Sequence, residues 1–360
     1  MSSVPVPEGR YVLLNQLRAL AALSVVYSHL VGNFLVYTGQ SWRLDDAVHA
    51  VFLNPLGFHD NGGWLGVSLF FFISGFVVTF SGTKASRWGF ISRRLVRVYM
   101  TLVIVVVVIA ILSWWGVRIW TVTGPVTGLD VAANASLAVF ALHSADLSSA
   151  PWLPAAWTLV TEVMFYFLVL AILPVLKNRP RLAPWAALAL VAFVVMALTA
   201  VNAPGSLATH ANMLSLMVMG QATYLFRSGR LPRLEWVGAM LAAPAVTYAL
   251  SLIAPSAISG PYARNYWTVT GIGLILFLAA VFADGKWKGF RAFNFIARRS
   301  YSIYLVHVPV GYTVMLALWH AGWMPRETVL VGLVAVAIAA ELAFQAAERP
   351  TKAVVRRLKR

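Results

Sequence analysis

The sequence contains no cysteine, which excludes disulfide bonds, thiolate metal sites and a cysteine nucleophile. It also has little charge: 11% of its 360 residues are charged, against about 25% in an average soluble domain. Acidic residues are the scarcest, with 12 against 28 lysines and arginines. Because 60% of the residues are hydrophobic, the chain is expected to lie in a lipid bilayer.

Apolar runs long enough to cross a bilayer recur along nearly the whole chain, each needing about 20 residues. They predict an all-α, polytopic membrane helix bundle of about ten transmembrane helices. No stretch is left for a soluble domain, so residues 1–360 are interpreted as one integral-membrane domain. The predicted spans lie near residues 11–36, 63–82, 98–116, 154–176, 182–202, 208–226, 234–253, 265–283, 300–319 and 327–347.

The basic residues orient this bundle. With the N-terminus inside, 23 lysines and arginines fall in the predicted inner segments and 4 in the outer ones. This asymmetry predicts that both termini are cytoplasmic. The formal charge of +16 therefore indicates topology and contact with anionic lipid headgroups, not nucleic-acid binding. Two long outer segments, Tyr37 to Gly62 and Val117 to Leu153, could cap a site that faces outward.

The first predicted span carries Arg18 and His29 in the stretch "LRALAALSVVYSHL". A charged side chain at the centre of a bilayer costs at least about 2.5–3.5 kcal/mol, so most spans avoid one. At 100° per residue both side chains project from the same helix face, with Arg18 in the inner third and His29 in the outer third. One interpretation is a functional pair; the other is an arginine that reaches the headgroups and a structural histidine.

The fourth predicted span supplies Glu162 in "WTLVTEVMFYFL", about 12 Å inside the outer boundary. This depth is similar to that of His29. A carboxylate in a span should face the protein interior, so we predict that Glu162 pairs with His29 and raises its basicity as a general base. The alternative is a structural contact between Glu162 and an arginine or the backbone.

Two further spans contribute polar groups. The ninth, "RRSYSIYLVHVPV", places His307 near the cytoplasmic end with Tyr304 beside it, although a kink at the following proline could also require a donor. The second, "GVSLFFFISGFVVTF", holds Ser74 and Gly75, for which close helix approach is the alternative explanation. Ser74 and His307 would give a polar path between the cytoplasmic side and His29.

The inner loop "RWGFISRRLVRVYM" concentrates Arg93, Arg94 and Arg97. Ordinary positive-inside charge is one explanation. The functional interpretation is a binding patch for phosphates, because guanidinium groups match phosphate oxygens. A cytoplasmic acyl-CoA offers several phosphates.

Taken in order, these stretches resemble the membrane acyltransferase-3 family, whose members O-acetylate bacterial surface polysaccharides. The similar stretches run from Leu14 to about Lys352, nearly the whole chain. They are "LNQLRALAALSVVYSHL", "GVSLFFFISGF", "RRLVRVY", "WTLVTEVMFY", "SYSIYLVHVPV" and "ERPTK". The sequence departs from the common family pattern where Asn15 and Gln16 replace Asp-Gly and where Met100 replaces proline. No carboxylate therefore stands beside Arg18 in the sequence.

The resemblance implies transfer of an acyl group, usually acetyl, from cytoplasmic acetyl-CoA to a carbohydrate hydroxyl outside, as in exopolysaccharide biosynthesis. It implies a multi-pass protein of the bacterial inner membrane that needs no metal. Arg18 and His29 take the essential Arg–His role, and Arg93, Arg94 and Arg97 the arginine-cluster role. We add Glu162 to the catalytic residues, and Ser74, Tyr304 and His307 to the donor-binding ones.

Two questions stay open at the level of sequence. His29 could act as general base or as transient acyl carrier. The same intramembrane Arg18, Glu162 and histidines could instead serve a proton-coupled secondary transporter, or an acyl-group translocator without transferase chemistry. Such transporters usually show inverted repeats, and none is evident in this sequence.

Overall fold

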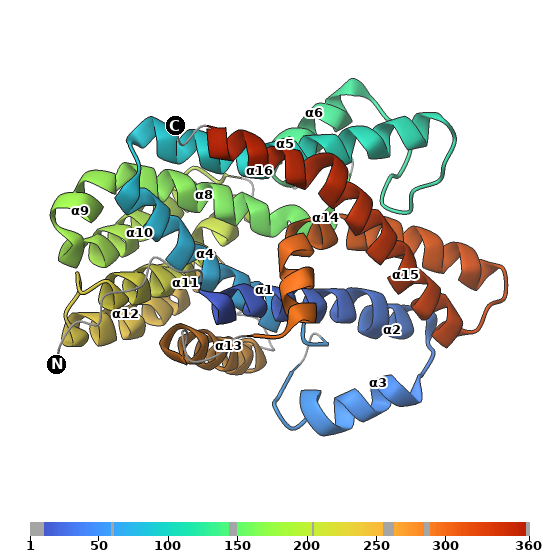
Figure 1. Ribbon diagram of the computed structural model, residues 1–360, viewed down its shortest axis with the longest axis horizontal. Coiled ribbons are helices and arrows are strands. Elements are labelled where there is room, and N and C mark those ends of the chain that lie inside the picture. The colour runs from blue at the N-terminus through green and yellow to red at the C-terminus, as the bar shows by residue number, and fades with distance from the viewer. Residues whose placement is uncertain are drawn as a thin grey trace.

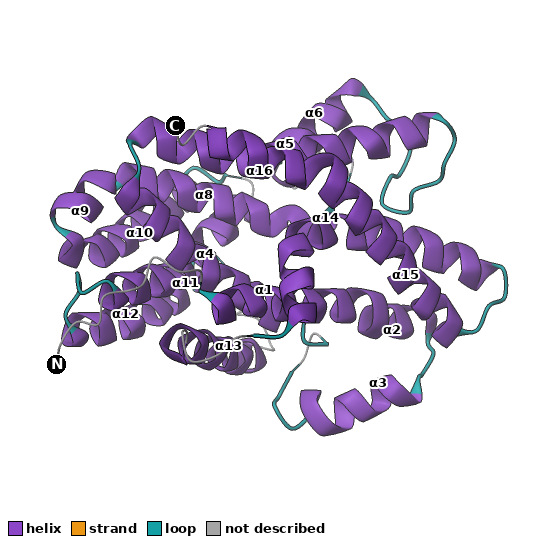
Figure 2. Cartoon of the chain, in the orientation of Figure 1, coloured by secondary structure: helices purple, strands orange, loops and turns teal. Residues whose placement is uncertain are grey.

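The computed structural model describes residues 11–58, 61–143, 150–203, 205–254, 263–283 and 289–357. Across these residues the regular structure is helical, and no β-strand occurs among them (Figure 2). Eight helices of the described chain are long and apolar enough to cross a membrane. The prediction of an all-α, polytopic helix bundle is therefore confirmed.

The helices follow one another in a simple order. They are α1 (Val12–Tyr27), α2 (Phe34–Thr38), α3 (Arg43–Val48), α4 (Gly63–Lys84), α5 (Arg87–Trp114), α6 (Gly128–Ser136), α7 (Val139–His143), α8 (Trp157–Ala171), α9 (Leu173–Asn178), α10 (Ala183–Ala200), α11 (Gly205–Arg227), α12 (Arg233–Ser251), α13 (Ala263–Ala283), α14 (Arg291–His320), α15 (Pro325–Ala343) and α16 (Arg349–Arg357). A π-helical segment, Ser28–Asn33, joins α1 to α2, so that one continuous rod runs from Val12 to Thr38. A second π-helical segment, Phe344–Glu348, joins α15 to α16.

Helices occupy all ten predicted spans, but α11 and α12 are not among the eight that qualify by length and composition. The polar side chains of α11 explain its low hydropathy. Asn212, Ser215 and Gln221 are fully buried, because α11 packs against α4, α8, α10 and α12. A helix enclosed by other helices needs no apolar surface toward lipid. That α11 and α12 also cross the bilayer stays a prediction.

Several of the connections between helices lie at two opposite ends of the bundle. In Figure 1 the links α4–α5, α8–α10 and α11–α12 lie at the left, whereas α3, α6 and the link α14–α15 lie at the right. The first set contains segments predicted to be inside, and the second contains segments predicted to be outside. The placement of these segments therefore agrees with the predicted alternation, and which end faces the cytoplasm stays a prediction.

Two helices begin well before the spans predicted from hydropathy. The stretch interpreted as an inner loop, with Arg93, Arg94 and Arg97, is instead the start of α5, which begins at Arg87. Ser86 caps this helix, since its Oγ accepts a hydrogen bond from the Gly89 N–H at 3.1 Å. Hydropathy missed this start because arginines lower the average, although they are good helix formers. Likewise α14 begins at Arg291 rather than near residue 300.

The segment before α8 lies inside the bundle rather than on its outer surface. Trp152 and Leu153 are buried, and the backbone N–H of Trp152 donates to Oδ1 of Asn134 on α6 at 2.8 Å. The first turn of α8 therefore already lies below the surface. Depth counted from the predicted outer boundary underestimates how far Glu162 reaches into the protein.

Helices α4 and α11 approach each other closely at the centre of the bundle. A Cβ at Gly75 would overlap the backbone carbonyl of Met217, and one at Gly220 would overlap that of Phe72. Only glycine lets two backbones come this near. Close approach of the two helices thus explains why residue 75 is glycine, which was the alternative explanation given for this stretch. The neighbouring Ser74 does not share this packing role, because it lines a cavity.

Candidate active site

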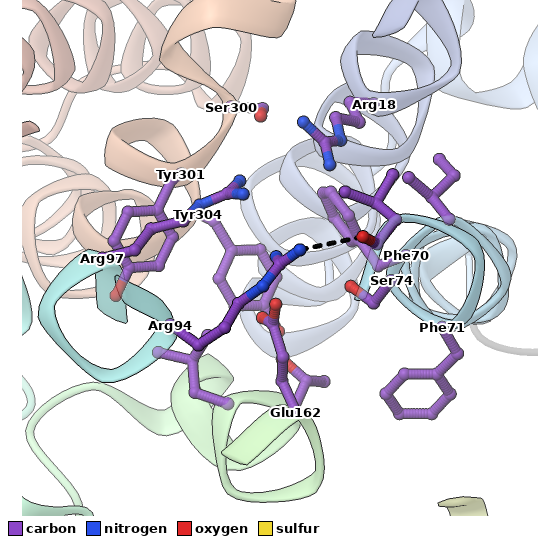
Figure 3. A pocket seen from close by; sticks show the side chains of 14 residues that line it. Arg18, Phe70, Phe71, Ser74, Arg94, Arg97, Glu162, Ser300, Tyr301 and Tyr304 are labelled. Atoms are coloured by element: carbon purple, nitrogen blue, oxygen red, sulfur yellow. Dashed lines mark hydrogen bonds between the residues drawn. The ribbon is translucent and has the colours of Figure 1, made fainter. Parts of the chain in front are cut away.

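A cavity of about 80 Å³ opens between α1, α4, α5, α8 and α14. Figure 3 shows Arg18, Arg94 and Glu162 pointing into the same space. Polar and apolar side chains share its wall. They are Arg18, Phe70, Phe71, Ile73, Ser74, Val77, Arg94, Arg97, Thr158, Leu159, Glu162, Ser300, Tyr301 and Tyr304.

The cavity has an excess of positive charge. Three guanidinium groups, those of Arg18, Arg94 and Arg97, line it together with one carboxylate, that of Glu162. Arg94 is buried and Arg18 half-buried, while Arg97 is exposed. Among the described lining residues the balance is therefore two positive charges. An excess of buried positive charge favours an anionic ligand.

The buried charges are held by defined partners. Arg94 Nη2 donates to the backbone carbonyl of Val77 at 2.8 Å, and its guanidinium lies 5.7 Å from the ring centre of Tyr166. The Tyr166 hydroxyl donates to Oε1 of Glu162 at 2.5 Å. Tyr166 thus lies between the Glu162 carboxylate on α8 and the Arg94 guanidinium on α5. Residues Glu162 and Tyr166 are four apart on one helix, which is the spacing of side chains that meet.

Hydroxyl groups line the opposite wall. Tyr304 donates from its hydroxyl to the carbonyl of Ala155 at 2.6 Å and lies 2.7 Å from Oγ1 of Thr158. Tyr301 donates to the carbonyl of Val98 at 2.8 Å. These bonds tie α14 to the start of α8 and to α5, so the cavity wall is cross-linked by its own polar side chains.

A pair of histidines lies beside the cavity. Nδ1 of His29 is 2.8 Å from Nε2 of His307, and the two rings are nearly parallel, with an angle of 6° between their planes. Nδ1 of His307 is 2.8 Å from the backbone carbonyl of Tyr304, whose side chain lines the cavity. The Tyr312 hydroxyl donates to the carbonyl of His29 at 3.0 Å.

The backbone around His29 is unusual. His29 lies in the π-helical segment Ser28–Asn33, where backbone hydrogen bonds join residues five apart instead of four. Single π-helical turns occur frequently at functional sites. His307 is fully buried, whereas His29 is half-buried, so His29 is the accessible member of the pair.

The predicted pairing of His29 with Glu162 is wrong. Among the described residues, His29 contacts His307, and Glu162 contacts Tyr166 near Arg18 and Arg94. The error comes from the depth estimate, because α8 begins inside the bundle. Glu162 therefore reaches the level of Arg18, not that of His29. The different depths predicted for His29 and His307 are also wrong, since the two rings are in contact.

The other predicted residues divide into two groups. The cavity is lined by Arg94, Arg97, Ser74 and Tyr304, whereas His307 is not among its described lining residues. Arg93 is not among the described lining residues. It comes one residue before Arg94, so its side chain points about 100° away from that of Arg94 around the axis of α5. Of the predicted cluster of Arg93, Arg94 and Arg97, the last two therefore line the cavity.

Sequence reasoning missed Tyr166 and Thr158 as parts of the site. Tyr166 stands four residues after Glu162, and Thr158 stands four residues before it. The helical i, i+4 rule applied to Glu162 would have found both. Thr158 contacts Tyr304, and Tyr166 contacts Glu162.

Comparison with known proteins gives one match. A family model described as an acyltransferase domain matches residues 11–343, most of the chain and all of the site described above. No curated protein and no solved structure matches the chain significantly. The chain is a multi-pass membrane protein with an acyltransferase domain, and it belongs to the acyltransferase-3 family.

Proposed function

We propose that this membrane acyltransferase moves an acetyl group from cytoplasmic acetyl-CoA to a carbohydrate hydroxyl at the outer face of the bacterial inner membrane. The observation that carries the proposal is the arginine cavity, where Arg18, Arg94 and Arg97 face one carboxylate among the described lining residues. Acyl-CoA is an anionic donor whose phosphates suit guanidinium groups. The carbohydrate acceptor and the membrane follow the family resemblance.

The donor enters from the end of the bundle where α5 begins. Arg97 is exposed and meets the phosphates first, while Arg94 and Arg18 lie deeper. The thin pantetheine arm of the donor then extends along the wall of Ser74 and Tyr304 toward the histidine pair. Phe70 and Phe71 supply apolar surface for this arm.

The chemical step is an acyl transfer between a thioester and a hydroxyl. His29 takes the proton of the acceptor hydroxyl as its oxygen attacks the thioester carbonyl carbon. The carbon–sulfur bond breaks, and the CoA thiolate leaves and takes up the proton from His29. In the acyl-carrier alternative, His29 itself attacks the thioester and the CoA thiolate leaves; the acceptor hydroxyl then takes the acyl group, and its proton passes to the released imidazole. Both forms place His29 at the reacting atoms.

The proposal is tested by release of CoA thiol. The purified protein in lipid nanodiscs receives acetyl-CoA with and without base-deacetylated surface polysaccharide from the native host. Because the chain has no cysteine, a thiol reagent reports only free CoA. We expect CoA release that depends on the polysaccharide, together with new acetyl esters on the polysaccharide by mass spectrometry. Acetyl-CoA that stays intact with every acceptor would overturn the proposal.

Replacement of His29 completes this test. His29→Ala should lower the rate by at least about 10³-fold, as expected for the loss of a central catalytic group. His320→Ala is the matched control, because His320 is exposed at the end of α14, and its rate should equal that of the wild type. A folded His29→Ala protein that works at the wild-type rate would exclude both forms of the mechanism. An acetyl group found on His29 without acceptor would select the carrier form.

A further inference from the structure

A continuous chain of contacts runs from the backbone of α14 to the ring of His29. It begins at the carbonyl oxygen of Tyr304, which lies 2.8 Å from Nδ1 of His307. Nε2 of the same ring lies 2.8 Å from Nδ1 of His29. Each contact has the length of a good hydrogen bond.

The order of donors and acceptors along this chain follows from its fixed end. A carbonyl oxygen can only accept, so Nδ1 of His307 carries a hydrogen. A neutral imidazole has one N–H, which leaves a lone pair on Nε2 of His307. That lone pair needs a donor, and Nδ1 of His29 is the group that faces it. Nδ1 of His29 therefore carries its hydrogen, and Nε2 of His29 carries a lone pair.

Both rings are assigned as neutral because of where they lie. His307 is fully buried, and no carboxylate contacts either ring among the described residues. A buried imidazolium without a counter-ion would be costly. Two imidazolium rings also could not form the contact between them, since neither facing nitrogen would accept.

The proline two residues beyond His307 does not account for this arrangement. Pro309 lacks an N–H and so frees the carbonyl four residues earlier, which is that of Leu305. His307 instead contacts the carbonyl of Tyr304. The proposed alternative, in which His307 merely satisfies the carbonyl freed by a kink, does not describe the contact that is present.

From this geometry we infer that His307 is a positioning residue that fixes the tautomer of His29, leaving Nε2 of His29 as the proton acceptor. The inference rests on the proposed function in that His29 acts on an acceptor hydroxyl. The Tyr312 hydroxyl, bonded to the His29 carbonyl at 3.0 Å, holds the backbone of the same turn. When Nε2 takes a proton, Nδ1 still donates to His307, so the contact persists through the reaction.

The same chain couples His29 to the donor cavity. The Tyr304 carbonyl holds His307, while the Tyr304 hydroxyl bonds to the cavity wall at Ala155 and Thr158. One residue of α14 therefore sets both the shape of the cavity and the tautomer of the base. The base and the donor site are positioned by one rigid helix.

The test reads the tautomer directly. The protein labelled with ¹⁵N-histidine contains seven histidines, and the His29 signals are assigned from a His29→Gln sample. Long-range ¹H–¹⁵N spectra distinguish a ring protonated at Nδ1 from one protonated at Nε2. We expect His29 to be protonated at Nδ1 in the wild type. A wild-type His29 protonated at Nε2 would overturn the inference, and this readout needs no substrate.

Two variants separate positioning from simple packing. In His307→Gln, the amide oxygen can accept from Nδ1 of His29, whereas His307→Leu fills space without an acceptor. We expect His307→Gln to keep the tautomer and stay within about tenfold of the wild-type turnover number. We expect His307→Leu to lose the single tautomer and about 10²-fold or more in turnover, with KM for acetyl-CoA unchanged, as for groups that orient a catalytic side chain. The control is His320→Gln on the same helix.

The outcomes distinguish the inference from the proposed function. A folded His307→Leu protein with wild-type tautomer and turnover overturns the positioning role while leaving acyl transfer intact. A wild-type protein that has the expected tautomer but releases no CoA supports the positioning role of His307 and overturns the proposed function. If His307→Leu does not fold, the wild-type and His307→Gln spectra decide the matter.

Discussion

Arg94 donates a hydrogen bond to the backbone carbonyl of Val77 at 2.8 Å, which joins α5 to α4. This bond holds the guanidinium at the wall of the cavity. Arg97, one turn later, lines the same cavity but is exposed. The two arginines therefore differ in how firmly they are held, and the buried one is expected to fix the position of an anionic ligand.

Arg94→Lys should raise KM for acetyl-CoA by about 10- to 100-fold, because lysine keeps the charge but cannot both hold Val77 and present a planar fork. The matched control is Arg93→Lys, which changes the neighbouring arginine outside the described cavity lining. Steady-state kinetics with varied acetyl-CoA measure both. If neither substitution changed KM, the cluster would act through its overall charge alone.

Glu162→Gln should tighten the binding of CoA by about three- to tenfold, because it removes a negative charge that offsets the arginines. The glutamine oxygen can still accept from the Tyr166 hydroxyl, so the local packing is kept. Tyr166→Phe, which removes that bond but not the charge, is the control and should leave the affinity nearly unchanged. Calorimetric titration with CoA measures both variants. Weaker binding by Glu162→Gln would mean that the carboxylate orders the arginines instead of opposing the ligand.

Gly75→Ala should lower the free energy of unfolding by about 1–3 kcal/mol, because its methyl group would overlap the carbonyl of Met217 where α4 meets α11. Gly271→Ala on α13 is the control, since a Cβ there meets no atom within 4 Å. Thermal unfolding in detergent compares the two. A Gly75→Ala protein as stable as the control would show that α4 and α11 can separate at no cost.

A single cysteine can decide whether α11 and α12 cross the membrane. The chain lacks cysteine, so Ser228→Cys, between α11 and α12, introduces the only thiol. If both helices span the bilayer, an impermeant maleimide should label this position from the cytoplasmic side only. Gln40→Cys, in the first outer segment, should be labelled from the other side. Labelling of both positions from one side would place the link between α11 and α12 outside.

Much of the fold could be predicted from the sequence, because a bilayer demands the same thing of every span. Apolar runs and the scarcity of charge predicted a helical membrane bundle, and basic residues predicted an alternation that the helix connections follow. Helix starts were predicted less well. At Arg87 and Arg291 the helices continue into charged sequence, where hydropathy falls although helix propensity does not.

The polar residues of the site were also visible in the sequence, since each stands out against an apolar background. Arg18, His29, Glu162 and His307 were each found on that ground. Their membership in an acyltransferase family was predicted from ordered motifs, and the match over residues 11–343 confirms it.

Only the tertiary structure decided which of these residues meet. Residue counting gives depth from an assumed surface, and that surface was wrong for α8, because the segment before it is already buried at Trp152 and Leu153. Counting therefore paired His29 with Glu162, whereas the fold places His29 against His307 and Glu162 among arginines. The periodicity of a helix fixes which side a residue faces, but its partner depends on how neighbouring helices are offset along their axes. That offset is set by close contacts such as Gly75 against Met217, which no single helix encodes.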